Sequence, residues 1–193
     1  MRHAVLLAGC AALVAACNKA PEINEKNASI EQVADKVRDS GAELYFNPGK
    51  WQTKVTVEEM NIPGMPASMQ GRIKQGSAGQ QSTVGESCLT PEEAKRPGGK
   101  FFTGNESKNC RYERFTMAGG KIDAVMRCEG GDRSTSMVMT VVGTYTPNSS
   151  MARVEMQVSG GSHGSMAIKA VAENRRIGEC TGNETNVAVG GEG

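Results

Sequence analysis

The sequence has few of the large apolar side chains that usually fill a protein core. Aromatic residues make up 4% of the 193 residues, and beyond residue 16 the only leucines are Leu44 and Leu89. Valine and the 11 methionines supply most of the apolar volume. Methionine fills irregular gaps but specifies packing weakly, so a small core of this kind needs covalent support.

The chain also lacks an excess of charge of either sign. Its 22 Lys and Arg residues are balanced by 21 Asp and Glu residues. Basic and aromatic side chains alternate near Arg111, Tyr112, Arg114 and Phe115, but in a neutral chain this pattern is explained by an ordinary strand with solvent-exposed arginines. We therefore expect no nucleic-acid partner.

No apolar run is long enough to cross a membrane as a helix. A short basic start precedes an apolar run over residues 4–16, whereas a spanning helix needs roughly 20 apolar residues. A run of this length after a basic start is typical of an export signal. We therefore expect residues 1–16 to be a lipoprotein-type signal peptide and the rest of the chain to face the periplasm in the bacterial cell envelope.

The end of the apolar run resembles a bacterial lipobox. In Val14-Ala15-Ala16-Cys17 the cysteine would carry the lipid that holds the protein on the membrane. Cys10 ends a second match, but cleavage there leaves only a short apolar segment. We expect Cys17 to be the lipid anchor. In the alternative, ordinary cleavage near Ala16 or Ala20 releases a soluble periplasmic protein.

Four cysteines remain beyond the expected signal peptide and anchor, and none of them forms a CxxC pair. They are Cys88, Cys110, Cys128 and Cys180. An even number in an oxidising compartment predicts two disulfides, for which three connectivities are possible. The absence of CxxC spacing argues against a thioredoxin-like redox site or a zinc knuckle.

The stretch from Cys110 to Cys128 predicts a β-hairpin. Two strand-like runs are separated by residues 118–120, which contain two glycines. With a three-residue loop, Met117 lies opposite Lys121, and Cys110 lies opposite Cys128 within bonding reach.

The same register sets Arg111 against Arg127. A disulfide that closes this loop contributes roughly 3 kcal/mol, which exceeds the cost of the charge clash. If Cys110 bonds to Cys128, Cys88 is left to bond to Cys180.

Hydrophobic periodicity predicts one helix and a series of strands. Ser29 followed by Gln32 resembles a capping box, and apolar residues recur at helical spacing until Gly41. From Trp51 the apolar residues alternate with polar ones, which indicates a strand with one buried face. Further strand-like runs cover residues 82–89, 110–117, 121–128, 135–145, 152–158 and 166–172.

Most of the connections between these runs are too short for parallel crossovers, so successive strands should pair antiparallel. We predict a mainly β fold: an antiparallel meander of about seven strands forming a curved sheet or partly closed barrel, with a short N-terminal helix and two disulfides. We expect a tether at residues 17–28, a single disulfide-stapled domain at 29–180, and a disordered tail at 181–193.

Several short motifs occur in an order that resembles the bacterial envelope proteins of domain-of-unknown-function family 3617. They are Gly49-Lys50-Trp51, Met65-Pro66, Cys88-Leu89-Thr90-Pro91-Glu92, Cys110, Cys128 and the segment from Arg175 to Cys180. The resemblance covers roughly residues 49–180. It implies an exported, cysteine-stapled domain that often carries a lipoprotein-type signal. It implies no activity and no catalytic residues.

The sequence shows no arrangement typical of a catalytic site. His163 is the only histidine beyond the signal peptide, and the neighbouring Ser162 would point away from it in extended chain. Acidic residues occur as sequence neighbours, such as Glu58-Glu59 and Glu92-Glu93, which is a poor arrangement for paired acid and base catalysis. We expect no cofactor and no enzymatic activity, with a hydrolase acting through unidentified carboxylates as the alternative.

Methionine is the one unusual feature that could carry chemistry. Thioethers select Cu(I), and Met60, Met65 and Met69 surround a proline-containing loop. Other methionines, such as Met137 and Met139, alternate along strands and are explained as core. A periplasmic Cu(I) site at the loop is therefore a further alternative, and we expect no metal site.

Taken together, these features predict a non-enzymatic envelope domain on a membrane anchor. Alternating strands rich in valine and methionine would give a curved sheet with an apolar face. We expect this domain to bind an apolar ligand or an envelope protein partner.

Overall fold

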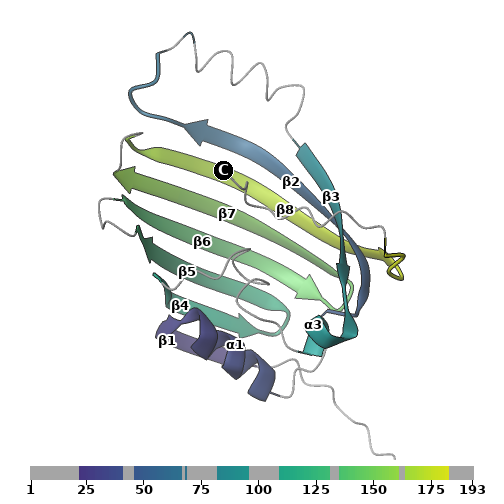
Figure 1. Ribbon diagram of the computed structural model, residues 1–193. Helices are drawn as coiled ribbons and strands as arrows, with labels where there is room; N and C mark the ends of the chain where they lie inside the picture. The colour runs from purple at the N-terminus through teal and green to yellow at the C-terminus, as the bar shows by residue number, and fades with distance from the viewer. Residues whose placement is uncertain are drawn as a thin grey trace, which may run out of the picture.

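The fold is one antiparallel sheet of eight strands that curls without closing (Figure 1). The computed structural model describes residues 22–40, 46–66, 68, 82–95, 109–130, 135–160 and 164–182. The strands are β1 (Ile23–Ser29), β2 (Gly49–Asn61), β3 (Ser82–Leu89), β4 (Cys110–Ala118), β5 (Lys121–Glu129), β6 (Thr135–Thr146), β7 (Ser149–Gly160) and β8 (Met166–Gly178). Their order in the sheet is β1-β4-β5-β6-β7-β8-β2-β3. The predicted mainly β, curved-sheet fold is confirmed.

Two helices accompany the sheet in the described part of the chain. Helix α1 (Ile30–Asp39) begins at the predicted capping box, in which the Gln32 amide donates to Ser29 Oγ at 3.2 Å and the Ser29 amide donates to Gln32 Oε1 at 2.8 Å. Helix α3 (Pro91–Lys95) is a single short turn capped in the same way by Thr90 and Glu93. Neither is long and apolar enough to span a membrane.

The hairpin of β4 and β5 reaches the predicted cysteine pairing by a different register. The connection is the two-residue turn Gly119-Gly120, in which both residues have positive φ, as a type I′ turn requires. Ala118, and not Met117, therefore lies opposite Lys121. A register shift near Glu113 compensates for this one-residue difference and restores Cys110 opposite Cys128.

Both predicted disulfides are present, and the predicted opposition of Arg111 and Arg127 is also confirmed. Cys110 bonds to Cys128, and Cys88 bonds to Cys180 across 92 residues of sequence. The two arginines are separated by their partners: Arg111 donates to the Asn27 carbonyl at 2.6 Å, and Arg127 donates to Glu113 at 2.6 Å. The hydrogen bond and charge of Glu113 raise the pKa of Arg127.

The meander is less continuous than predicted. Strands β4 to β8 pair in sequence order, but β3 does not pair with β4, and β2 lies between β8 and β3.

Strand β1 was not predicted, since residues 23–28 were expected to belong to the tether. Asn27 has a φ of +50°, which interrupts the alternation and leaves only Ile23 and Ala28 buried. The sequence of β1 therefore lacks the apolar alternation by which the other strands were predicted.

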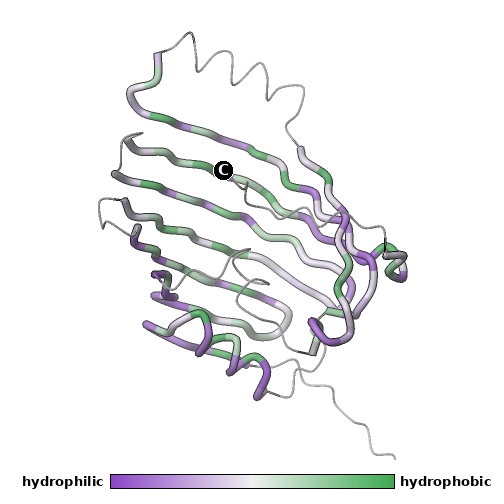
Figure 2. The backbone as a smooth tube through the Cα atoms, viewed as in Figure 1, coloured by the Kyte–Doolittle hydropathy of each residue, from purple (hydrophilic) through white to green (hydrophobic). Residues whose placement is uncertain are grey.

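The fully buried core lies at the β1 side of the sheet. There Val33 and Val37 of α1 pack over Phe115 and Met117 of β4 and Met126 of β5. We call the face of the sheet on which α1 packs the inner face. Figure 2 shows hydrophobic and hydrophilic residues alternating along the central strands, as expected for a sheet with one apolar face.

Several predictions concern residues outside the described part of the chain. These are the signal peptide at 1–16, the second lipobox match at Cys10, the anchor at Cys17, the helix stop at Gly41, the loop methionine Met69, His163 and the tail from residue 183 onward.

Candidate functional site

The inner face carries a row of large apolar side chains, four methionines and one isoleucine, that crosses five strands. Met126 of β5 lies opposite Met139 of β6, which lies opposite Met156 of β7. The row continues through Ile168 of β8 to Met60 of β2. Because directly opposed residues share a face, these side chains form one continuous strip.

The rows on either side of this strip are also apolar. Over the middle of β6, β7, β8 and β2, every residue that faces inward is a hydrophobic residue or glycine. These residues are Met137, Met139, Val141, Gly143, Ala152, Val154, Met156, Val158, Met166, Ile168, Ala170, Ala172, Val55 and Val57. The predicted apolar alternation of these strands is therefore confirmed.

Helix α1 covers only one side of this surface. It packs against β1 and β4, and the buried core extends from there to Met126 and Tyr145. Met156 and Ile168, farther along the strip, are only half-buried, and Met60 is 37% exposed. Among the described residues, the inner face of β7, β8 and β2 thus remains partly accessible.

The outer face of the same strands carries the charged side chains, some of them in ion pairs, although Met151 and, on the neighbouring β6, Val142 are also more than half exposed there. Lys169 of β8 contacts Glu59 of β2 at 2.8 Å, and Lys54 of β2 lies 3.7 Å from Glu173 of β8. The hydrogen bond and charge of Glu59 raise the pKa of Lys169. These exposed ion pairs contribute little stability, but they keep the outer face solvated.

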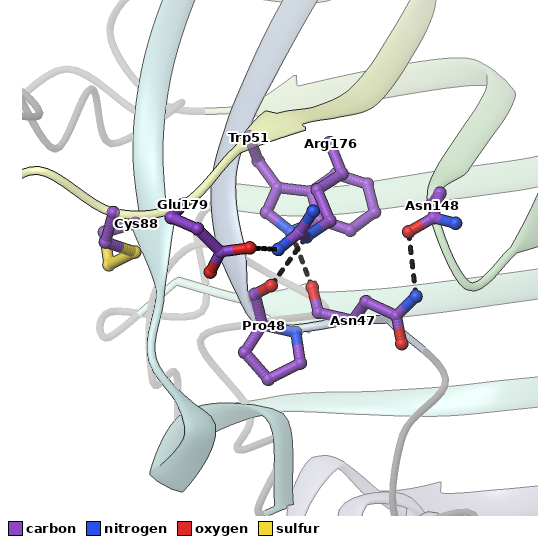
Figure 3. A network of polar contacts seen from close by, with 8 residues as sticks. Asn47, Pro48, Trp51, Cys88, Asn148, Arg176 and Glu179 are labelled. Carbon is purple, nitrogen blue, oxygen red and sulfur yellow. Dashed lines mark hydrogen bonds and ion pairs between the residues drawn. A yellow bond between two sulfur atoms is a disulfide. The ribbon is translucent and has the colours of Figure 1, made fainter.

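A second feature is a polar network at the end of the sheet where β2 begins and β8 ends (Figure 3). Trp51 is buried and donates from Nε1 to the Asn47 carbonyl at 3.0 Å. Asn47 in turn donates from Nδ2 to Asn148 Oδ1 at 2.8 Å, and Asn148 lies in the turn between β6 and β7. The network thereby ties the start of β2 to a neighbouring hairpin.

Arg176 is the centre of this network. It lies opposite Trp51 in the β2–β8 pairing, donates from Nε to the Pro48 carbonyl at 2.6 Å, and forms an ion pair with Glu179. The guanidinium therefore connects the end of β8 to the segment before β2. The Cys88–Cys180 disulfide closes the same region by joining β3 to the residue after Glu179.

Three of the motifs that carried the family resemblance thus converge in space, whereas Met65-Pro66 and the Cys110–Cys128 disulfide lie at the other end of the sheet. Gly49, Lys50 and Trp51 begin β2, Cys88 ends β3, and the segment from Arg175 to Cys180 ends β8. The hydrogen bonds, ion pair and disulfide described here join parts of the same domain, and the described residues of these motifs form no catalytic arrangement of nucleophile and base. The network holds the strand ends of the curled sheet in place.

The remaining candidate residues that the structure describes are not brought together as a reactive site, and His163 and Met69 lie outside the described residues. No group of three or more His, Cys, Asp or Glu side chains in the described residues could hold a metal ion. Of the loop methionines, Met60 is exposed and Met65 is half-buried, and Met65 donates its backbone amide to the Ile62 carbonyl at 3.2 Å.

A hollow of about 390 Å³ lies beside the turn between β6 and β7. Its lining combines polar and charged side chains, such as Gln52, Lys54 and Arg175, with the apolar groups of Tyr145 and Met151. The charged side chains in this lining make the hollow a poorer match for a wholly apolar ligand than the inner face, whose central residues are all hydrophobic or glycine.

Comparison with known proteins gives one match. A family model described as "Protein of unknown function (DUF3617)" matches residues 46–180, which is more than half of the chain. No curated protein and no solved structure matches the chain.

Proposed function

Since the chain belongs to the DUF3617 family, whose description assigns no activity, we propose a function from its sheet: a non-enzymatic, lipid-anchored binding domain of the cell envelope. In this proposal the inner face receives an apolar ligand. The observation that carries it is the strip from Met126 to Met60, which runs beyond the part of the sheet that α1 covers.

The composition of the strip supports binding of this kind. Methionine side chains are unbranched and polarizable, so they adapt to ligands of different shape. Helix α1 and the Cys110–Cys128 disulfide hold the β1 side of the sheet, and the Cys88–Cys180 disulfide holds β3 to the end of β8, while Met156 and Ile168 stay partly accessible. A rigid frame with an adaptable apolar surface should select ligands by their hydrophobicity more than by their precise shape.

The expected location is consistent with the covalent structure. Two disulfides form and persist in oxidising compartments such as the periplasm. The expected anchor at Cys17 would keep the domain close to a supply of apolar molecules, namely the lipids of the membrane.

A pair of near-isosteric substitutions on β7 tests the binding proposal. Met156 faces inward and Gln157 faces outward, and the two side chains have similar length. Met156→Gln places a polar amide in the strip and should strongly weaken binding of a fluorescent fatty acid. Gln157→Met adds the same apolar group on the outer face and should leave binding unchanged. Thermal melting of both variants checks that the fold is retained.

Native mass spectrometry identifies what the domain carries when it is purified from its own envelope. The proposal expects a co-purifying lipid. A stable protein partner in place of the lipid would assign the inner face to protein assembly. If neither is present, and a hydrolase screen finds an activity that one carboxylate substitution abolishes, the binding proposal fails and the enzyme alternative replaces it.

The anchor is tested separately by Cys17→Ser. Without the thiol no thioether to lipid can form, so the protein should move from the membrane fraction to the soluble fraction. An unchanged distribution would reject Cys17 as the anchor. Release of the unchanged chain into the soluble fraction would favour ordinary cleavage near Ala16 or Ala20.

A further inference from the structure

We propose that the membrane faces one particular end of the sheet, the end that contains the turns Gly119-Gly120 and Pro147-Asn148. We call this the turn end. The proposal rests on the lipid anchor at Cys17 in the proposed function. It adds an orientation, and it assigns the turn end as the surface that meets the lipid headgroups.

The first residue of β1 lies at the turn end. Ile23, the first residue of β1, lies opposite Met117, which is two residues before Gly119. The Tyr145 amide donates to the Gly120 carbonyl at 2.8 Å, which brings the end of β6 to the same place. The chain that leads from Cys17 therefore enters the fold beside these two turns.

The connection from the anchor to the fold is short. A tether over residues 17–28 would leave the domain free to rotate, but the structure begins β1 at Ile23. The six steps from Cys17 to Ile23 span at most about 20 Å in fully extended chain. Strand β6, with 12 residues, is itself about 40 Å long. The opposite end of the sheet therefore cannot approach the bilayer unless the domain lies on its side.

The chemistry of the surface argues against the domain lying on its β1 side. That side presents the charged groups of α1, including Asp35, Lys36, Arg38 and Asp39, all of which are exposed. Charged groups lose solvation when they are pressed against a membrane. The four turn residues at the turn end carry no side-chain charge, and Ile177 nearby on β8 is 44% exposed, but Lys121 and Glu179 at the same end are exposed as well. The short connection from the anchor, more than surface charge, therefore favours the turn end as the surface that meets the headgroups.

Trp51 provides a natural probe of this orientation because it is the only tryptophan in the chain. It lies at the turn end, linked through Asn47 to Asn148 in the turn between β6 and β7. The acylated full-length protein is bound to phosphatidylcholine vesicles that contain a dansyl-labelled headgroup lipid. Energy transfer from tryptophan to dansyl then reports how close the turn end lies to the surface.

Two variants give the comparison. Insertion of twelve Gly and Ser residues after Ala20 lengthens the tether without altering the fold, and it should cause loss of most of the transfer from Trp51. The second variant combines Trp51→Phe with Ser159→Trp. It moves the tryptophan to the end of β7 that lies away from the turn end, so energy transfer to dansyl should also be much weaker. The insertion variant keeps the test valid if the second variant fails to fold.

The outcomes separate this orientation from the proposed function. Equal transfer with the lengthened tether, or stronger transfer from position 159, overturns the orientation even if the protein floats with the vesicles and still binds fatty acid. Failure of the protein to float with the vesicles overturns the anchor and the orientation together, while the fatty-acid assay still reports binding on the inner face.

Discussion

Gly49 and Gly178 approach each other so closely that a β-carbon on Gly49 would collide with the Gly178 carbonyl oxygen. The same β-carbon would also meet the guanidinium group of Arg176. Gly49 has a φ of +138°, a backbone conformation that other residues rarely adopt. Only glycine at position 49 therefore allows β2 and the end of β8 to close around the polar network.

We predict that Gly49→Ala lowers the free energy of unfolding by about 1–3 kcal/mol, because the substitution adds both backbone strain and a collision. Urea denaturation measures the change. Gly64→Ala is the matched control, since Gly64 also has a positive φ of +86° but has open space around it. If the two variants lose equal stability, the close approach of Gly49 to Gly178 has no energetic consequence.

The two disulfides should differ in their contribution to stability. Loop closure predicts about 3 kcal/mol for Cys110–Cys128 and about 4.6 kcal/mol for Cys88–Cys180, because the second loop is much longer. Replacing each pair by alanine and measuring urea denaturation tests this order. A larger loss from the Cys110–Cys128 pair would mean that loop length is not the main source of the stabilisation.

Burial of Tyr112 should make the protein sensitive to alkaline pH. The side chain is 3% exposed, and desolvation raises the pKa of its phenol. In the unfolded chain the group ionises near its ordinary pKa of about 10, while in the folded protein it stays protonated. The contribution of this group to the free energy of unfolding is therefore fully present below pH 10. Above pH 10 the free energy of unfolding falls by up to about 1.4 kcal/mol per pH unit, because the phenol ionises only in the unfolded chain.

Urea denaturation between pH 8 and pH 11 measures this dependence. Tyr112→Phe removes the ionisable group but keeps the ring that packs against Phe115 at a centroid distance of 5.1 Å. The variant should show a shallower loss of stability above pH 10 than the unchanged protein. Identical slopes would show that Tyr112 does not titrate differently in the folded and unfolded states.

We also predict that the protein does not bind Cu(I) tightly. Met60 and Met65 flank a loop in which Pro63, Gly64 and Pro66 leave little freedom to form a preset cage of thioethers. Competition against a Cu(I) chelator measures the affinity. Tight binding that is lost when Met65 and Met69 are changed to leucine would make copper handling the leading function.

The cysteine pairing was predictable from sequence, but the register that produces it was not. Counting outward from a three-residue loop sets Cys110 opposite Cys128, and the structure reaches the same pair with a shorter turn and a shift near Glu113. Glycines at both turn positions favour the two-residue turn, whereas a bulge depends on the fit of β4 between β1 and β5. The shorter turn and the register shift compensate for each other, so Cys110 still lies opposite Cys128.

The candidate site was predictable only in part. The apolar alternation of β6, β7 and β8 is visible in the sequence, since each residue's face follows from its position along the strand. That Met126, Met139 and Met156 form one strip depends on how three strands align, and that alignment is set by the pairing of whole strands.

By itself, the sequence determined the local features of this protein: the helix at the Ser29 capping box, seven of the eight strands, and the number of disulfides. These depend on interactions within a few residues, or on chemistry that composition reveals. Only the tertiary structure decided that β2 inserts between β8 and β3, which places Trp51 opposite Arg176. It also decided that β1 belongs to the sheet. Such pairings join segments far apart in the chain, and they form because the curled sheet buries one common face, a condition that no local pattern contains.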